Sequence, residues 1–352
     1  MNATAQLMGE LLAAEGPSGR ESEVVKILEP MWRALANRVE RSRLGSLHAL
    51  KRGEGREPRP SLMMAAHIDS IGMMVSGNVG GLLTVSPIGS VNPYVLPGLP
   101  VIVHGRREVP GVVTLRPSPP GAVPKQAVAG TAPRIFVDTG LASQQVSRFI
   151  RVGDIVSIDL PPVGLESGHM SGRALDNRAG IAALTLCLEQ LSTERHSWDV
   201  WAVATTQEET TYGGAATSAY ALRPDLALAV DTTFGKGAGA DGWHYFEVGG
   251  GPTLCVGPNM HPGLHARFRQ VAEAQQIPHS IEPVPASSES DAMALQVTGD
   301  GMPTMLLCIP VRNMHTAVEV VALRDVEETA RLLTAFVVSL EPDFLSRMAW
   351  DT

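Results

Sequence analysis

Cysteine is scarce in this chain, and long apolar runs are missing. Its 352 residues contain three cysteines, Cys187, Cys255 and Cys308, which are far apart and lie inside apolar segments. This distribution is typical of buried thiols in a reducing compartment and does not fit a disulfide framework or a zinc cluster. No run approaches the ~20 apolar residues of a membrane span, and the first residues lack the basic and apolar regions of a signal peptide. We therefore expect a soluble, cytoplasmic protein without a membrane partner.

Basic residues are in the minority. The chain has 28 Lys and Arg against 36 Asp and Glu, and its net charge is −8. Nucleic-acid binding needs a dense basic patch, and the most basic stretch, residues 41–52, is more typical of a solvated face. Charged residues make up 18% and apolar residues 44% of the chain, which is ordinary globular composition. We expect a folded protein that does not bind nucleic acid.

The pattern of apolar residues changes twice along the chain. Residues 1–70 and 165–352 alternate amphipathic helices with short apolar strands, which predicts an α/β fold with a mixed, largely parallel sheet flanked by helices. Residues 71–164 contain short β-branched segments separated by Gly and Pro, which is typical of a small all-β barrel or sandwich. The expected strands lie within residues 81–89, 99–105, 109–115, 134–138 and 154–160. We therefore predict a discontinuous α/β domain with an inserted β domain. Residues 116–134, rich in Pro, Gly and Ala, predict a long loop.

Individual elements can be placed within the α/β part. Helices are expected over residues 6–14, 21–35, 176–191, 215–222, 263–275, 291–296 and 326–339. Strands are expected over residues 61–66, 200–204, 226–230, 253–256, 279–284 and 304–309.

Polar side chains follow the predicted strands at the point where each strand ends. They are the histidines His67 and His315 and the carboxylates Asp69, Glu208, Glu209 and Asp231. A further carboxylate, Asp176, stands at a predicted helix start and is also a candidate helix cap. Taken singly, each is more typical of a turn, a cap or a surface histidine. Because the carboxyl ends of parallel strands meet at one edge of a sheet, we expect the set to converge in one crevice.

Several carboxylates in one crevice repel each other unless cations neutralise them. Imidazole and carboxylate ligands without cysteine suit Zn²⁺, Mn²⁺ or Co²⁺ in a catalytic site. The set exceeds what one catalytic zinc needs and fits two cations that share a bridging carboxylate and activate a bridging water. Because neighbouring side chains of an extended segment diverge, one of Glu208 and Glu209 can hold a cation while the other faces water or substrate.

Seven short motifs carry a resemblance to a known family. They are GPSGRE at 16–21, AAHIDSIGMMV at 65–75, FVDTG at 136–140, GRALDNRAG at 172–180, TTQEET at 205–210, AVDTT at 229–233 and IPVRNMHTAVEVV at 309–321. In this order, and across nearly the whole chain, they resemble the dinuclear metallo-aminopeptidases of the glutamyl/deblocking type. That family forms tetrahedral (TET) assemblies and has sometimes been described as endoglucanases.

The resemblance implies a role for each site residue. Asp176 would bridge two divalent cations, one completed by His67 and Asp231 and the other by Glu209 and His315. The other two site residues are implied to be Glu208 as the general base and Asp69 as the hydrogen-bond partner of the far nitrogen of His67. The implied cations are Zn²⁺, with Co²⁺ or Mn²⁺ as alternatives, and the implied substrates are short peptides with a free N-terminus. The inserted β domain would enclose substrate and make contacts in a homo-oligomer, by the resemblance a tetrahedral dodecamer.

The chain departs from the family pattern at three motifs. After Gln-Glu-Glu the family has an aliphatic residue and a Gly, and this chain has Thr210 and Thr211 in their place. Tyr212 follows, and the Arg that the family has before the next Gly is missing before Gly214. The string 289–292 retains Asp291, either at the edge of the site or as a helix cap, and Asn313 replaces a Tyr. No basic residue marks a pocket for acidic side chains. The apolar neighbourhood of Met260, Met293 and Met302 either favours neutral or hydrophobic N-terminal residues or is simple core filling, which is the commoner use of methionine.

Three other functions remain open on the sequence. The first is a dinuclear amidohydrolase of the aminoacylase or deacetylase type, which would use the same metal centre on acylated substrates. The second is a glycosidase, which needs two free carboxylates on either side of the scissile bond. The third is a non-catalytic assembly protein on the same fold. We expect the aminopeptidase.

Overall fold

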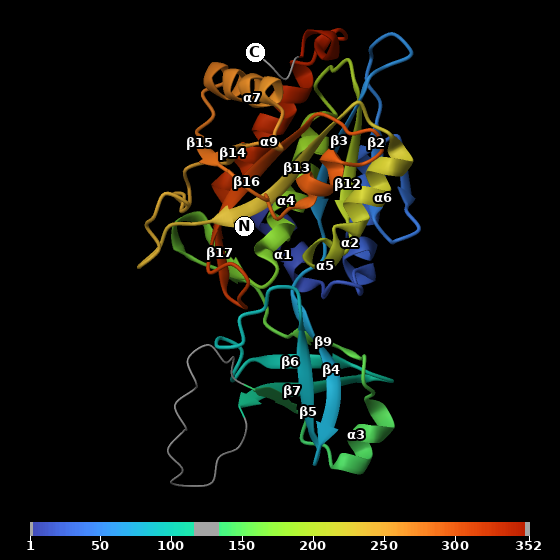
Figure 1. Cartoon of the computed structure of the whole chain (residues 1–352), viewed down its shortest axis with the longest axis vertical. Coiled ribbons are helices and arrows are strands. Elements are labelled where there is room, and N and C mark those ends of the chain that lie inside the picture. The colour runs from blue at the N-terminus through green and yellow to red at the C-terminus, as the bar shows by residue number, and fades with distance from the viewer. Residues whose placement is uncertain (1–2, 116–133, 349–352) are drawn as a thin grey trace.

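The computed structural model describes residues 3–115 and 134–348, and these residues form a large α/β unit and a smaller barrel (Figure 1). The α/β unit contains residues from both ends of the chain, and the barrel is built from a segment between them. The predicted fold class, a mixed and largely parallel sheet flanked by helices with an inserted all-β unit, is confirmed. No helix in the described part of the chain is long and apolar enough to cross a membrane.

The large sheet has eleven strands within the described residues. Its main path is β1 (Arg38–Arg41), β2 (Leu47–Lys51), β12 (Asp199–Thr205), β3 (Ser61–His67), β13 (Leu226–Phe234), β16 (Thr304–Arg312), β17 (Glu319–Ala322), β11 (His169–Gly172) and β10 (Val163–Gly164). Strand β14 (Thr253–Val256) branches from β16 and pairs with β15 (Ser280–Pro283). The four central strands β12, β3, β13 and β16 are parallel to one another, so their carboxyl ends share one edge.

Helices cover both faces of this sheet. One face carries α1 (Ala3–Ala13), α2 (Ser22–Leu35), α4 (Leu175–Gln190), α7 (Pro262–Ala274) and α9 (Leu323–Val338), which pack on one another and on the strands. The other carries α6 (Gly213–Leu222) and α8 (Asp291–Gln296), and the single turn α5 (Glu208–Thr211) precedes α6. All seven helices predicted in this unit are present, with no end shifted by more than three residues, as expected because helix ends fray.

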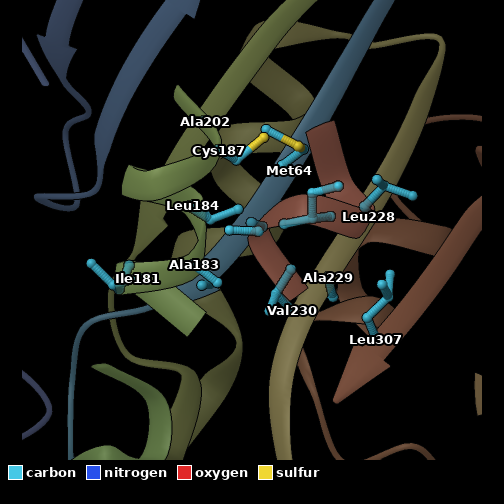
Figure 2. Packing of buried hydrophobic residues seen from close by; sticks show 14 of the residues in the cluster. Met64, Ile181, Ala183, Leu184, Cys187, Ala202, Leu228, Ala229, Val230 and Leu307 are labelled. Carbon is cyan, nitrogen blue, oxygen red and sulfur yellow. The ribbon is translucent and has the colours of Figure 1, made fainter. Parts of the chain in front are cut away.

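Helix α4 is buried around its circumference, as expected for a helix whose own side chains are apolar on every face. Its side chains Ile181, Leu184 and Cys187 are fully buried, and the helix packs across β3 and β13. Figure 2 shows Cys187 beside Met64 of β3, with Leu228 of β13 in the same packed layer. This packing fixes the first turn of α4, which carries Asp176, against the carboxyl edge of the sheet.

The barrel is closed by six antiparallel strands. In order around the barrel they are β4 (Gly72–Val79), β5 (Leu82–Ile88), β8 (Ile135–Asp138), β7 (Glu108–Leu115), β6 (Pro100–His104) and β9 (Ile155–Ile158). Helix α3 (Ser143–Phe149) lies at its end away from the large unit (Figure 1). Alternate residues such as Val101, Val103 and Val156 point inward and form a core separate from that of the sheet.

Backbone hydrogen bonds and a histidine–glutamate contact help to join the barrel to the α/β unit. The backbone of Ser70, just before β4, exchanges hydrogen bonds with Gly16 and Ser18 in the α1–α2 loop. The imidazole Nε2 of His104 in β6 lies 2.9 Å from Glu15 Oε2 and 2.8 Å from Ser157 Oγ. These contacts position the barrel beside the carboxyl edge of the central strands.

The structure differs from the sequence-based expectation in several segments. The basic stretch 41–52 was interpreted as a solvated face, but it contains β2, whose Leu47 and Ala49 are fully buried. Strands β1, β4, β10, β11 and β17 and helix α3 were not predicted. Residues Val163 and Gly164, assigned from sequence to the inserted unit, pair with β11 of the large sheet. The predicted loop 116–134 lies outside the described residues except for Arg134.

Candidate active site

Six of the seven predicted site residues line one cavity of about 720 Å³ at the carboxyl edge of the parallel strands. The six are His67, Asp176, Glu208, Glu209, Asp231 and His315. The seventh, Asp69, lies directly behind the wall and is fully buried. They come from the end of β3, the start of α4, the turn after β12, the body of β13 and the turn after β16. The topology therefore brings together residues that span about 250 positions of the sequence.

Asp176 lies at the centre of this group. Its Oδ1 is 3.2 Å from His67 Nε2, and its Oδ2 is 3.2 Å from His315 Nε2. Asp231 Oδ1 lies 3.5 Å from the same nitrogen of His67, and Glu209 Oε2 lies 3.9 Å from that of His315. The two imidazoles thus face opposite oxygens of one carboxylate, each with a second carboxylate beside it.

Asp176 does not cap α4, which was one of its two predicted roles. Its ψ of 103° is not helical, and the side chain that accepts a helical N–H is that of Asn177, whose Oδ1 takes the Gly180 N–H at 3.0 Å. Asn177 also donates from Nδ2 to the carbonyl of Val230 at 2.7 Å. Because Asn177 supplies the cap and ties α4 to β13, the Asp176 side chain is free to point into the cavity.

Glu208 and Glu209 open a helical turn and not the extended segment that the sequence suggested. Gln207 before them has a left-handed backbone with φ of 58°, which ends the direction of β12 abruptly. Their side chains still diverge, because Glu208 Oε2 approaches His67 Nε2 at 3.8 Å whereas Glu209 approaches His315. The two side chains therefore diverge as expected, but from a helical turn and not from an extended segment.

Asp69 contacts His67 mainly through its main chain. The Nδ1 atom of His67 lies 3.1 Å from the carbonyl oxygen of Asp69 and 3.6 Å from its carboxylate Oδ1. The carboxylate instead accepts the backbone N–H groups of Glu208 and Glu209, at 3.0 and 3.1 Å. Asp69 thus contacts the far nitrogen of the imidazole through its main-chain carbonyl, and its carboxylate closes the turn that carries both glutamates.

Sequence analysis missed Glu319 as an individual site residue. It lies on β17, is 1% exposed, and accepts the backbone N–H groups of Asp176 at 3.1 Å and His315 at 2.8 Å. An acidic residue inside the apolar run 317–323 was the available signal, since a buried carboxylate needs hydrogen-bond donors. Glu319 thus holds the backbone of Asp176 and His315 in place.

Excess negative charge dominates the electrostatics of the site. Burial raises the pKa of Glu208 to about 11, and burial together with the charge of Asp176 raises the pKa of Glu209 to about 8. Burial alone would lower the pKa of His315, but the hydrogen bond and charge of Asp176 raise it to about 9. Burial also raises the pKa of Asp231. Without cations, this crevice retains protons well above the pH at which free carboxylates lose them.

The residues present fit a pair of cations. His67, Asp176 and Asp231 offer ligand atoms within 4.8 Å of one another, and so do Asp176, Glu209 and His315. The two groups share Asp176. Glu209 Oε1 is buried without a hydrogen-bond partner, so this oxygen has a lone pair to offer. Imidazole and carboxylate donors of this kind are those of catalytic divalent-cation sites.

The barrel contributes to the site. Ser90, just beyond the end of β5, lines the cavity. The neighbouring Gly89 has φ of +73°, and a Cβ atom there would lie 2.8 Å from Glu209 Oε2. Trp243 and His244 from the β13–β14 loop also line the cavity. Residues of both units therefore line it.

The segments that depart from the family pattern contribute unequally. Of the three residues 210–212, Tyr212 lines the cavity, whereas the hydroxyl of Thr210 lies 3.0 Å from that of Ser18. Asp291 begins α8 behind the site and accepts the Thr205 hydroxyl on Oδ2 at 2.5 Å; the cap position belongs to Ser290. Of the three methionines considered, Met293 lines the cavity, and Met260 is core.

A helix-flanked parallel sheet with an attached barrel, and a carboxylate–imidazole cavity at its carboxyl edge, defines the class of metal-dependent hydrolases. The sequence profile of the M42 glutamyl aminopeptidase family matches residues 45–332. The chain belongs to this family, and it is a metal-dependent aminopeptidase, an exopeptidase.

Individual relatives agree along the whole chain. The chain is 32% identical to the lysyl aminopeptidase of Pyrococcus furiosus over 343 residues, covering 96% of this chain and 97% of that one. An aminopeptidase from the archaeon Desulfurococcus kamchatkensis superposes with a TM-score of 0.89 at 29% identity, over 98% and 97% of the two chains. A TET aminopeptidase from a marine-sediment Thaumarchaeota archaeon gives a TM-score of 0.89 at 28% identity, over 98% and 99%.

Proposed function

We propose that this aminopeptidase removes N-terminal residues from short peptides with two divalent cations and a glutamate base. The observation that carries the proposal is the position of Asp176, whose two oxygens each lie 3.2 Å from a different imidazole. We assign Asp176 as the bridging ligand, His67 and Asp231 to one cation, and Glu209 and His315 to the other. We favour Zn²⁺, with Co²⁺ or Mn²⁺ as the alternatives that metal analysis would distinguish.

Bound there, the two cations would polarise the scissile carbonyl and lower the pKa of an attacking water. The chain supplies the proton transfer. Glu208 lines the cavity but belongs to neither of the two ligand groups that meet at Asp176. We assign it to take the proton from water and to return it to the leaving amine. Its burial, at 7% exposure, keeps bulk water from competing for that proton.

Asp69 and Glu319 would act as positioning residues. Asp69 holds the backbone of both glutamates and the Nδ1 side of His67, which favours the tautomer with a free Nε2. Glu319 holds the backbone of Asp176 and His315. Such outer contacts orient ligands before a cation binds.

We propose that neutral and basic N-terminal residues are preferred to acidic ones. Among the described residues that line the cavity there is no Lys or Arg, whereas Glu282 and Glu289 add to its carboxylates. The Pyrococcus furiosus relative is a lysyl aminopeptidase, which agrees with this charge. The apolar wall residues Phe234, Trp243 and Met293 suit aliphatic side chains as well.

We propose further that residues 71–164 limit access to the cavity and contribute to a homo-oligomer of the tetrahedral type. The position of Gly89 and Ser90 beside Glu209 supports the first part, and the likeness to a TET aminopeptidase supports the second. Three free, buried cysteines support a reducing, cytoplasmic location. Sedimentation of the purified enzyme tests the assembly, and a monomer at micromolar concentration would contradict it.

The decisive experiment compares Glu208→Gln with the exposed control Glu247→Gln, with metal analysis of both. We expect Glu208→Gln to retain two cations per subunit and to lose kcat by about 10²–10⁴-fold, while the control keeps full activity. Unchanged hydrolysis in Glu208→Gln would remove this residue from its role.

Substrate tests separate the alternatives. Cleavage of free but not N-acetylated peptides is expected, and a preference for acylated substrates would favour the amidohydrolase. Chelator-insensitive activity on a polysaccharide would favour the glycosidase.

A further inference from the structure

Two of the three cysteines lie side by side, and one of them, Cys308, lines the catalytic cavity. Cys255 on β14 and Cys308 on β16 are both buried, and their sulfur atoms are 3.7 Å apart. Cys308 pairs in register with Asp231 on the neighbouring strand β13, so the sulfur pair lies next to the proposed cation site. Cys187 is in a different place, on α4 inside the main core.

A carboxylate completes this group. Glu282 on β15 is the register partner of Cys255, and its oxygens accept the hydroxyls of Thr233 at 2.8 Å and Thr253 at 2.5 Å. Ligand atoms of Cys255, Glu282 and Cys308 all lie within 4.8 Å of one another. The two threonines fix the orientation of the carboxylate, as outer contacts do at metal sites.

The distance between the sulfurs distinguishes two uses of a cysteine pair. A disulfide has its sulfurs about 2.05 Å apart, so the strands would have to shift to form one. Two thiolates bound to one tetrahedral cation with bonds of about 2.3 Å have their sulfurs about 3.8 Å apart. The observed 3.7 Å matches this edge of the tetrahedron without movement of the backbone.

The group also has a route of entry. Cys308 and Glu282 both line the catalytic cavity, so a cation that enters with solvent reaches them. Three protein ligands leave one tetrahedral position for water. Thiolates are soft ligands and favour d¹⁰ ions over the ions that prefer oxygen and nitrogen alone.

We propose that Cys255, Cys308 and Glu282 form a third cation site, selective for a thiophilic divalent ion such as Zn²⁺ or Cd²⁺. Binding displaces the two thiol protons into solvent, so the affinity rises with pH. None of the three residues belongs to the groups that meet at Asp176. The site therefore shares no ligand with the catalytic cations.

Spectroscopic titration with Cd²⁺ tests the proposal on enzyme that carries two zinc ions per subunit, so that the third site is free to take cadmium. Thiolate-to-cadmium charge transfer absorbs in the ultraviolet, and the catalytic group contains no sulfur, so this absorption reports only on cysteine ligands. We expect one equivalent of Cd²⁺ to produce the band in the wild-type enzyme and in the control Cys187→Ser. We expect Cys308→Ser and Cys255→Ser to lose the band, and Glu282→Gln to weaken the affinity by roughly 10-fold or more.

Each outcome decides the matter. Circular dichroism and thermal melting show which variants are folded. If one of the two serine variants does not fold, the other provides the test. Absence of the band in the wild type, or its persistence in a folded Cys255→Ser or Cys308→Ser variant, would overturn the proposal. A thiol assay that finds Cys255 and Cys308 joined in a disulfide in the native enzyme would overturn it as well.

Discussion

Asp69 holds Glu208 through the main chain, because its Oδ1 accepts the Glu208 N–H at 3.0 Å. Its Oδ2 accepts the next N–H, that of Glu209, at 3.1 Å. A helical turn leaves its first N–H groups without partners. A carboxylate at that end accepts hydrogen bonds from them and interacts favourably with the positive end of the helix dipole. The carbonyl of the same residue contacts His67. One buried residue therefore sets the positions of the imidazole, the proposed base and a proposed ligand.

Replacing Asp69 with Asn should impair catalysis more than folding. The amide keeps one acceptor oxygen but places an NH₂ group against the other backbone N–H. We expect kcat/KM to fall by roughly 10–100-fold and the free energy of unfolding to fall by about 1–2 kcal/mol. The control is Asp138→Asn on the exposed barrel surface, where Asp138 also accepts a backbone N–H, from Gly140 at 2.8 Å. Equal activity in the two variants would contradict the positioning role.

Gly89 offers a test of how the barrel affects the site. Both Gly89 and Gly80 have left-handed backbones, with φ of +73° and +65°. A Cβ at Gly89 would lie 2.8 Å from Glu209 Oε2, whereas one at Gly80 would have nothing within 4 Å. Alanine at either position costs about 1–2 kcal/mol of backbone strain. We therefore expect similar melting temperatures for the two variants, but loss of activity and of cation affinity in Gly89→Ala alone. Equal kinetics in both would exclude the contact with Glu209.

The central sheet was predictable because its strands are buried on both faces. Strands β3, β13 and β16 are continuous apolar runs. The site residues near their ends were predicted because polar side chains follow these runs in the sequence. Strand β2 was missed because its buried Leu47 and Ala49 lie within a stretch of basic residues that dominates the pattern. Strand β4 was missed because glycine and serine interrupt its apolar residues.

The residues that could not be predicted act across long sequence separations. The turn at Glu208 is helical because Asp69, 139 residues earlier, satisfies its N–H groups, and no local signal shows this. Glu319 supports Asp176 from 143 residues away. The approach of Gly89 to Glu209 depends on how the barrel sits on the sheet. Sequence pattern thus identified six of the residues that line the cavity, and the structure supplied the residues that hold them in place.

Glu319→Gln should weaken the hold on cations. Glu319 accepts two backbone N–H groups with its two oxygens, and Gln offers one oxygen, so either Asp176 or His315 loses its anchor. We expect the affinity for the more weakly bound cation to fall by roughly 10–100-fold and excess metal to restore most of kcat. Dialysis against buffered metal followed by metal analysis measures this. A kcat loss that excess metal does not restore would point to a different defect.

Without cations the folded protein should become less stable as pH rises. Burial raises the pKa of Glu209 from 4.5 to about 8, and Asp176 raises that of His315 from 6.5 to about 9. In both cases the native state binds more protons than the unfolded chain between the two values. The free energy of unfolding therefore falls with increasing pH from about 4.5 to 9.

Calorimetry of chelator-treated and metal-loaded enzyme across this range measures the effect. We expect the melting temperature of the metal-free form to fall with pH, and the metal-loaded form to melt higher with a weaker dependence, since bound cations replace the protons. Metal-free Glu209→Gln should lose part of the slope. A metal-free enzyme whose stability increased from pH 5 to 8 would contradict the assignment of charges.

The charge of the cavity should decide which N-terminal residues are accepted. The described lining contains no Lys or Arg, so an acidic side chain meets carboxylates and no counter-charge. We expect kcat/KM for Lys and Leu anilides to exceed that for Glu anilide, with the preference for Lys decreasing as salt screens the charges. Tyr212→Arg places a cation in the wall and should raise kcat/KM for Glu anilide by roughly 10-fold while lowering it for Lys anilide. Tyr220→Arg is the matched control, because Tyr220 is 65% exposed on α6 and is not among the cavity-lining residues that the structure describes. If the wild-type enzyme prefers Glu anilide, or if both arginine variants shift the preference equally, the charge of this wall does not set the specificity.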